Sequence, residues 1–332
     1  MHIGNELLTP GAGLALIGIS GAGLSYAVWR ARKVLDERKV PLMGVMGAFV
    51  FAGQMINFPI MVGTSGHLGG GMLLAILLGP DIAALTMASI LIIQCLIFQD
   101  GGLFALGANI INMALVPSYI GWNIFKAISS LSSGTRMYYS AIFISSLLSV
   151  TIGALLVPLE VALSGIQLIP LQTFMVMMGG VHIIIGIVEG FITIAVIGFI
   201  YQVRPDVVSW TDHHKPVFSF RGVTLIFLLL TLLLSGYVSY YASHYPDGLE
   251  WVQEKLGIVP TEGVQVALDK PVDTSPLKSP LQDYQIPSEK LQAQYPHVSK
   301  GMAGAIGSII TLGMLFGVGA VLRRRRNEPH DY

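Results

Sequence analysis

Long apolar runs constrain this sequence of 332 residues more than any single motif. Crossing the hydrocarbon core of a bilayer, about 30 Å thick, takes ~20 helical residues. Only 11% of the residues are charged, against roughly 25% in soluble domains. Runs of about the required length occupy residues 10–30, 41–60, 81–99, 103–125, 137–158, 172–203, 222–241 and 302–322. The sequence therefore predicts an all-α, polytopic integral membrane protein.

A shorter apolar run, residues 67–79, begins in a glycine-rich stretch. At about a dozen residues it cannot span a bilayer alone, so we expect a half-helix whose irregular backbone lines a protected cavity. Counting this run as a crossing gives nine crossings in total.

The positions of the basic residues predict the orientation. With residues 67–79 counted as the third crossing, the lysines and arginines outside the loop 242–300 follow the first, fifth, seventh and ninth crossings. They are Arg30, Arg32, Lys33, Arg38, Lys39, Lys126, Arg136, Arg204, Lys215, Arg221 and Arg323 to Arg326. An external N-terminus and nine crossings put all of them on the cytoplasmic side, as the positive-inside rule requires. We therefore expect a multi-pass cell-membrane protein with its N-terminus outside and its C-terminus in the cytoplasm.

A polar stretch at 204–221 divides the chain and is expected to be a cytoplasmic linker. Residues 1–203 before it hold seven predicted crossings. Residues 222–332 after it hold two helices around the external loop 242–300. Because that loop is rich in proline and polar residues, we expect it to be extended and solvated.

The first two residues form a candidate metal chelate. In Met1-His2 the α-amine, the His2 amide nitrogen and the His2 imidazole can all turn towards one cation. His67, in the external glycine-rich turn, would add a fourth nitrogen, and four nitrogens in a plane suit Ni(II) or Cu(II) and, to a lesser extent, Co(II). The first long helix is expected to begin at Thr9-Pro10, so the eight residues before Thr9 can reach back about 25 Å into the bundle. A chain can also begin Met-His by chance, so the pattern needs support from the rest of the sequence.

Polar residues at the outer ends of the apolar runs are candidates to orient the metal ligands. They are Asn57, Asp100 and Asn109, and Ser65, in the turn that carries His67, is a further candidate. His182 and Glu189 are seven residues apart on one helix face and are expected to form a hydrogen-bonded pair. In the first helix, a stripe of small residues predicts close approach of another helix, from this chain or from a partner. The stripe consists of Gly11, Ala15, Gly18, Ala22 and Ser25.

An enzymatic alternative belongs to a different functional class. Gly63-Thr64-Ser65-Gly66 matches the Gly-x-Ser-Gly of rhomboid-type intramembrane proteases, and His182 would be the base of a Ser–His dyad. Against this alternative, the spacing after His182 is off by one, and the upstream histidine and asparagine of an oxyanion site are absent. The sequence also has no Gly-x-x-x-x-Gly-Lys-Ser/Thr motif, so a partner protein would have to hydrolyse ATP for any pumping.

Several separated motifs within residues 1–203 resemble the cobalt/nickel substrate-capture (S) components of energy-coupling-factor (ECF) ABC transporters, the CbiM/NikM family. They are Met1-His2-Ile3, Asn57-Phe58-Pro59, Gly63 to Leu68, Leu78-Gly79-Pro80, Asp100-Gly101-Gly102, Gly107-Ala108-Asn109, and His182, Gly186 and Glu189-Gly190 with Ile192-Thr193. Tyr245-Pro246-Asp247-Gly248-Leu249-Glu250 resembles the PDGLE module, the counterpart of the small CbiN/NikN subunit.

This resemblance implies a seven-helix S-component bundle fused to a two-helix module. It implies ligation of Ni²⁺ or Co²⁺, as transported ion and not as cofactor, by the Met1 amine, the His2 amide and imidazole, and His67. It also implies a membrane coupling (T) subunit and cytoplasmic ABC ATPase subunits as partners. Nickel is favoured, cobalt is the alternative, and a metal-independent vitamin-capturing component of the same transporter class is a further alternative. The sequence departs from the family at Gly4-Asn5-Glu6, where members commonly have Pro-Asp-Gly or Met-Glu-Gly.

Overall fold

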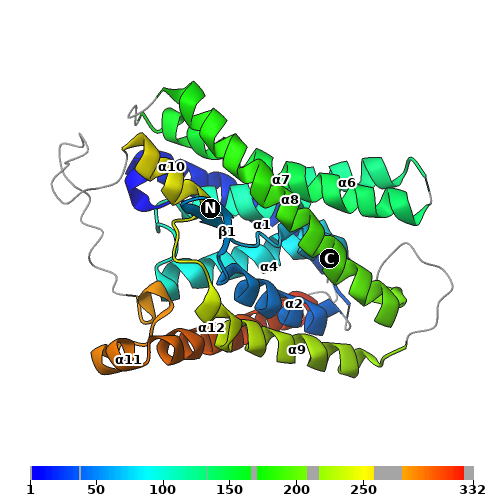
Figure 1. Cartoon of the computed structure of the whole chain (residues 1–332). Coiled ribbons are helices and arrows are strands. Elements are labelled where there is room, and N and C mark those ends of the chain that lie inside the picture. Colours follow the sequence, from blue (N-terminus) through cyan, green and yellow to red (C-terminus); the bar gives the residue numbers. More distant parts are fainter. Residues whose placement is uncertain are drawn as a thin grey trace, which may run out of the picture.

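The computed structural model describes residues 2–36, 39–132, 134–165, 170–207, 217–257 and 279–324. Among them, six helices are long and apolar enough to cross a membrane (Figure 1). They are α1 (Pro10–Val34), α4 (Pro80–Ile93) continued by the π-helical η2 (Gln94–Phe98), α7 (Thr135–Leu163), α8 (Leu171–Val203), α9 (Phe220–Gly236) continued by η5 (Val238–Tyr241), and α12 (Pro296–Arg324). The predicted all-α membrane architecture is confirmed.

The other apolar runs form shorter or irregular helices. The run at 103–125 becomes α5 (Leu106–Ile110), the π-helical η3 (Ile111–Gly121) and α6 (Trp122–Ser129). Pro117 lies inside η3, and since proline lacks an N–H and clashes with the preceding turn, a locally widened helix accommodates it. The glycine-rich run yields α3 (Gly71–Leu78), a helix of two turns, as expected for a half-helix. The division into seven plus two crossings stays a prediction.

The helix predicted to run through residue 60 is too long. α2 (Lys39–Gln54) stops earlier and is followed by an antiparallel hairpin of β1 (Phe58–Met61) and β2 (Thr64–Gly66). Pro59 disfavours a helix here because it has no N–H to donate, and Gly63 adopts the positive φ of 82° that the turn needs. The hairpin matters because it leads directly to His67.

The second half of the chain packs on the first. α2, α9 and α12 lie against one another, with Phe49 of α2 edge-on to Phe227 of α9 and Gly47 of α2 facing Leu315 of α12 (Figure 1). The C-terminal helices therefore bury part of α2.

The expectation of an extended, solvated loop at 242–300 is wrong for its first part. Residues 248–256 form α10 (Gly248–Leu256), with Leu249 and Val252 fully buried, and α10 packs against α8 and β2 (Figure 1). Two shorter helices follow, η6 (Gln282–Tyr284) and α11 (Glu289–Gln294). The apolar positions of α10 recur at helical spacing, so burying them outweighs the solvation of an extended chain. Half of the predicted linker and the middle of the loop, residues 208–216 and 258–278, lie outside the described residues.

The small-residue stripe of α1 is exposed and does not pack within the described chain. No atom lies within 4 Å of a Cβ placed at Gly11 or Gly18. The opposite face of α1 is buried instead, where a Cβ at Gly107 of α5 would lie 2.3 Å from the backbone nitrogen of Ile17. The described residues therefore leave the stripe uncovered.

This difference predicts unequal costs for the same substitution. Gly107→Ala should destabilise the fold by about 1–3 kcal/mol, because its methyl group forces two helix backbones apart. Gly18→Ala, the matched control on the exposed stripe, should change stability by less than about 0.5 kcal/mol. Thermal unfolding of the purified protein in detergent compares the two, and equal stability of both variants would contradict the close α1–α5 packing.

Candidate metal centre

The N-terminal segment is buried in the bundle and held by hydrogen bonds from the start of α5 and the loop before it. The Ile3 side chain is fully buried, and its backbone N–H donates to Asn109 Oδ1 at 2.8 Å. Asn109 Nδ2 donates back to the Ile3 carbonyl at 3.2 Å, which also accepts from the Gly102 N–H at 2.9 Å. Asn109 thus fixes the residue that follows His2.

The departure from the family at Gly4-Asn5-Glu6 belongs to the same anchor. Asn5 Oδ1 accepts a hydrogen bond of 2.9 Å from the Phe104 N–H, and Glu6 Oε1 accepts one of 3.4 Å from Gln253 Nε2 of α10. α1 begins at Pro10 as expected, with Thr9 bonded to Ser164 at the end of α7. The departure therefore supplies contacts that position the N-terminus.

His2 lies between two polar side chains that follow α4 in the chain, Gln94 of η2 and Asp100 of the next loop. Its Nδ1 is 3.1 Å from Asp100 Oδ1, and its Nε2 is 3.2 Å from Gln94 Oε1. Gln94 Nε2 in turn donates to Gln54 Oε1 at 2.9 Å, and Gln54 Nε2 donates to the Gly69 carbonyl at 2.8 Å. This chain of amides links the N-terminal segment to the turn that carries His67. For the predicted chelate through His2 Nδ1, the ring has to turn away from Asp100.

His67 stacks on His2, with ring centroids 5.3 Å apart and planes at 19°. Its Nδ1 lies 3.0 Å from the Leu68 carbonyl, so Nδ1 carries the proton and Nε2 carries the lone pair that a metal needs. Burial lowers the pKa of both imidazoles below the ordinary histidine value, which keeps them neutral. The two predicted imidazole ligands therefore meet in one place.

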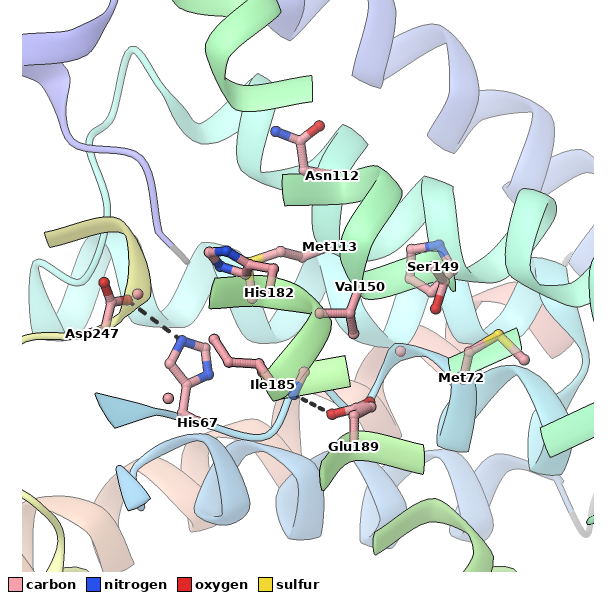
Figure 2. A pocket seen from close by; sticks show the side chains of 15 residues that line it. His67, Met72, Asn112, Met113, Ser149, Val150, His182, Ile185, Glu189 and Asp247 are labelled. Atoms are coloured by element: carbon pink, nitrogen blue, oxygen red, sulfur yellow. Dashed lines mark hydrogen bonds and ion pairs between the residues drawn. The ribbon is translucent and has the colours of Figure 1, made fainter. Parts of the chain in front are cut away.

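Glu189 of α8 holds the turn after His67. One of its carboxylate oxygens accepts a hydrogen bond from the Gly69 N–H at 2.7 Å (Figure 2), and the other accepts one from the Gly70 N–H at 2.8 Å. Gly70 has φ +75°, a conformation that glycine adopts without strain. The predicted His182–Glu189 pair is wrong. His182 Nδ1 bonds to the Met178 carbonyl, and its Nε2 has no hydrogen-bond partner among the described residues.

The other two candidate orienting residues hold the C-terminal segment. Ser65 Oγ donates to the Tyr245 carbonyl at 2.7 Å, and the Ser65 N–H donates to the Pro246 carbonyl at 2.8 Å. The backbone carbonyl of Asn57 accepts from the Ser243 N–H at 2.7 Å. Ser65 therefore does not hydrogen bond to His182, and the Ser–His dyad of the protease alternative is not formed.

The Pro-Asp-Gly-Leu-Glu motif docks on the histidine turn. Asp247 caps α10, and Glu250 Oε2 accepts from the Asp247 N–H at 2.9 Å, which completes a capping box. Gly248 sits so close to α8 that a Cβ there would lie 3.1 Å from His182 Cε1. Asp247 Oδ2 is 3.9 Å from His67 Nε2, and Figure 2 shows the two side chains pointing toward one another.

A cavity of about 40 Å³ extends from this point into the bundle, enough for roughly three water molecules. His67, Asp247, His182, Glu189, Asn112 and Met113 are among the residues that line it. Met1 lies outside the described residues. Within the described ones, no three His, Cys, Asp or Glu side chains are grouped to hold a metal.

Comparison with known proteins agrees with this architecture. A family model described as cobalt uptake substrate-specific transmembrane region (CbiM) matches residues 2–207, and one described as PDGLE domain matches residues 221–324. A putative fused nickel transport protein NikMN of Archaeoglobus fulgidus is 32% identical over 95% of this chain and 97% of its own length.

Two further relatives and a solved structure are also similar to this chain. A probable fused nickel transport protein LarMN of Lactiplantibacillus plantarum is 28% identical over 77% of this chain and 79% of its own length. A cobalt transport protein CbiM of Geobacter sulfurreducens is 28% identical over 77% of both chains. A crystal structure of a truncated transition metal transporter has a TM-score of 0.55 and 30% identity, covering 61% of this chain and 99% of that one.

The contacts of Glu189 predict its importance for the turn. Glu189→Gln replaces one acceptor oxygen with an amide NH2 group that faces a backbone N–H. This change should cost about 1–3 kcal/mol and weaken any metal binding at the turn roughly 10- to 100-fold. Glu160→Gln is the matched control, because Glu160 is also buried but accepts only from Asn112 Nδ2 among its hydrogen bonds in the described chain. Calorimetric titration with Ni(II) measures both variants, and unchanged affinity in Glu189→Gln would show that the turn is held without it.

Proposed function

Because this chain belongs to the CbiM family and carries a PDGLE domain after the CbiM region, we propose that it is the metal-capturing component of an ECF-type importer for Ni²⁺. The family membership makes it a nickel or cobalt transport component and a multi-pass membrane protein. Beyond this, we propose how it binds the metal, which metal it binds, how it is oriented in the membrane and which partners it needs.

The proposed ligands are the Met1 amine, the His2 amide nitrogen and imidazole, and His67 Nε2. The observation that carries this assignment is the stacking of His2 on His67, at 5.3 Å between centroids, around a buried N-terminal segment. A metal bound there would exchange its hydration shell for nitrogen ligands. The bonds of Asp100 to His2 and of Asn109 to Ile3 support a role for both residues in aiming the chelate.

Nickel is proposed over cobalt for two reasons. Four nitrogens in a plane suit Ni(II) better than Co(II). The fused arrangement of a CbiM region and a PDGLE domain also extends over nearly the full length of the relative described as a fused nickel transport protein. Cobalt is the alternative cargo, since the matched family model is described by cobalt uptake.

The proposed transport step takes the ion from the external side and needs partners. The basic residues favour an external N-terminus and hence an external metal site. The sequence has no P-loop motif, so ATP hydrolysis is assigned to cytoplasmic ABC ATPase subunits. The exposed small-residue face of α1 favours contact with a membrane coupling subunit, because small side chains let helices approach closely.

Titration of the purified protein with Ni(II) and with Co(II) tests this function. We expect one-to-one binding, tighter for Ni(II), that falls at least about 10- to 100-fold when one residue is added before Met1, because the extension displaces the amine. His67→Ala should have a similar effect. His244→Ala, which removes an exposed histidine outside the site, should leave the affinity unchanged.

Undiminished binding by the extended variant would move the site away from Met1 and His2. Absence of binding by the unaltered protein would reject metal capture and favour a vitamin as the cargo.

A further inference from the structure

The two carboxylate oxygens of Asp247 have different neighbours. Oδ1 accepts the N–H groups of Leu249 and Glu250, both at 2.9 Å, and so caps α10. Oδ2 faces the other way, 3.9 Å from His67 Nε2, and the Asp247 side chain is largely buried. Serine, threonine and asparagine cap helices as well as aspartate does, so capping alone does not require a negative charge here.

The separation between Asp247 and His67 suits a shared metal ion. Metal–nitrogen and metal–oxygen bonds are about 2.1 Å long. With Oδ2 and Nε2 at their present distance, one ion bonded to both would have an Oδ2–metal–Nε2 angle of about 135°. Moving the two atoms about 1 Å closer together would reduce this angle to a right angle. The Nδ1 contact with the Leu68 carbonyl already directs the lone pair of His67 to Nε2. The cavity described above is lined by both side chains.

Charge balance favours a carboxylate at this place. A divalent ion held by one deprotonated amide and otherwise neutral nitrogens leaves a net positive charge in a buried site, which is costly without a counter-charge. Asp247 supplies one negative charge on the His67 side. Asp100, 3.1 Å from His2 Nδ1, lies on the other side.

The position of Asp247 is fixed by its neighbours in the chain. The Pro246 carbonyl accepts from the Ser65 N–H, and Gly248 packs against Val181 and His182 with no room for a Cβ. Such support holds a ligand in place before the ion arrives, which lowers the entropic cost of binding.

We propose that Asp247 is a further ligand of the captured ion, an axial carboxylate that the C-terminal module contributes above the plane of nitrogens. This assignment rests on the proposed function. It makes the bound ion a direct link between the CbiM region and the PDGLE domain, so capture and docking of the module strengthen each other.

The test uses the full chain loaded with Ni(II) and X-ray absorption at the nickel edge. Planar four-coordinate Ni(II) gives a sharp edge shoulder from the empty axial orbital, and an axial ligand removes it. The unaltered protein should lack the shoulder. Asp247→Asn keeps the cap and removes the charge, and it should show the shoulder and bind nickel about 10- to 100-fold more weakly.

Two further variants control for folding and charge. Asp247→Ser caps the helix with a hydroxyl and offers no carboxylate or amide oxygen. It should therefore show the edge shoulder and weaken nickel binding at least as much as Asp247→Asn does. It replaces that variant if Asp247→Asn does not fold. Glu250→Gln removes a neighbouring negative charge but keeps the acceptor for the Asp247 N–H, and it should leave the nickel spectrum unchanged.

Identical spectra and affinities in the unaltered protein and the Asp247 variants would overturn this inference alone. A planar shoulder already present in the unaltered protein would overturn it as well. Absence of nickel binding by the unaltered protein would instead reject the proposed function, which the calorimetric titration detects independently.

Discussion

The hydrogen bonds between Asn109 and Ile3 are the interaction on which the arrangement of the site depends. A polypeptide end is normally solvated, and taking its backbone into a helix bundle leaves polar groups that must find partners. Asn109 provides both a donor and an acceptor to the same residue, and the Gly102 N–H shares the Ile3 carbonyl. With Ile3 fixed and its side chain fully buried, His2 has little freedom, and its ring reaches His67.

Polar side chains inside the apolar helices form hydrogen-bond networks around the candidate site. Gln94 contacts His2 and donates a hydrogen bond to Gln54, and Gln54 donates one to the Gly69 carbonyl. Glu189 accepts hydrogen bonds from the N–H groups of Gly69 and Gly70. Such groups are expensive in a membrane unless they are paired. Their pairing here fixes both histidines relative to one another, although the two residues are far apart in sequence.

The C-terminal module is a structural part of the candidate site. Its long helices α9 and α12 pack on α2, while its segment from Ser243 to Leu256 crosses to the histidine turn (Figure 1). Within the motif, the Pro246 carbonyl binds Ser65, Asp247 caps α10, the absent side chain of Gly248 makes room for His182, Leu249 is buried, and Glu250 closes the capping box. Each position of the motif has a distinct physical role in docking.

The sequence by itself determined the class of fold, and it singled out His2 and His67, whose rings meet in the candidate site. Apolar runs are local signals, and so are the Met-His start and the short glycine-rich half-helix, because neighbouring residues carry all the information. The same local signals failed where distant residues decide the structure. The hairpin at 58–66 and helix α10 form against surfaces that no window of sequence contains.

Tertiary structure alone decided which polar groups meet. Glu189 binds amides 119 and 120 residues away, and Ser65 binds carbonyls 180 and 181 residues away. Helical periodicity put Glu189 and His182 on one face and so suggested a pair. In the structure, Glu189 instead accepts from the two backbone N–H groups of the glycine turn, and His182 Nδ1 bonds to a carbonyl of its own helix. The local sequence pattern determines which residues lie on the same face of a helix. The packing of separate helices determines which groups that face contacts.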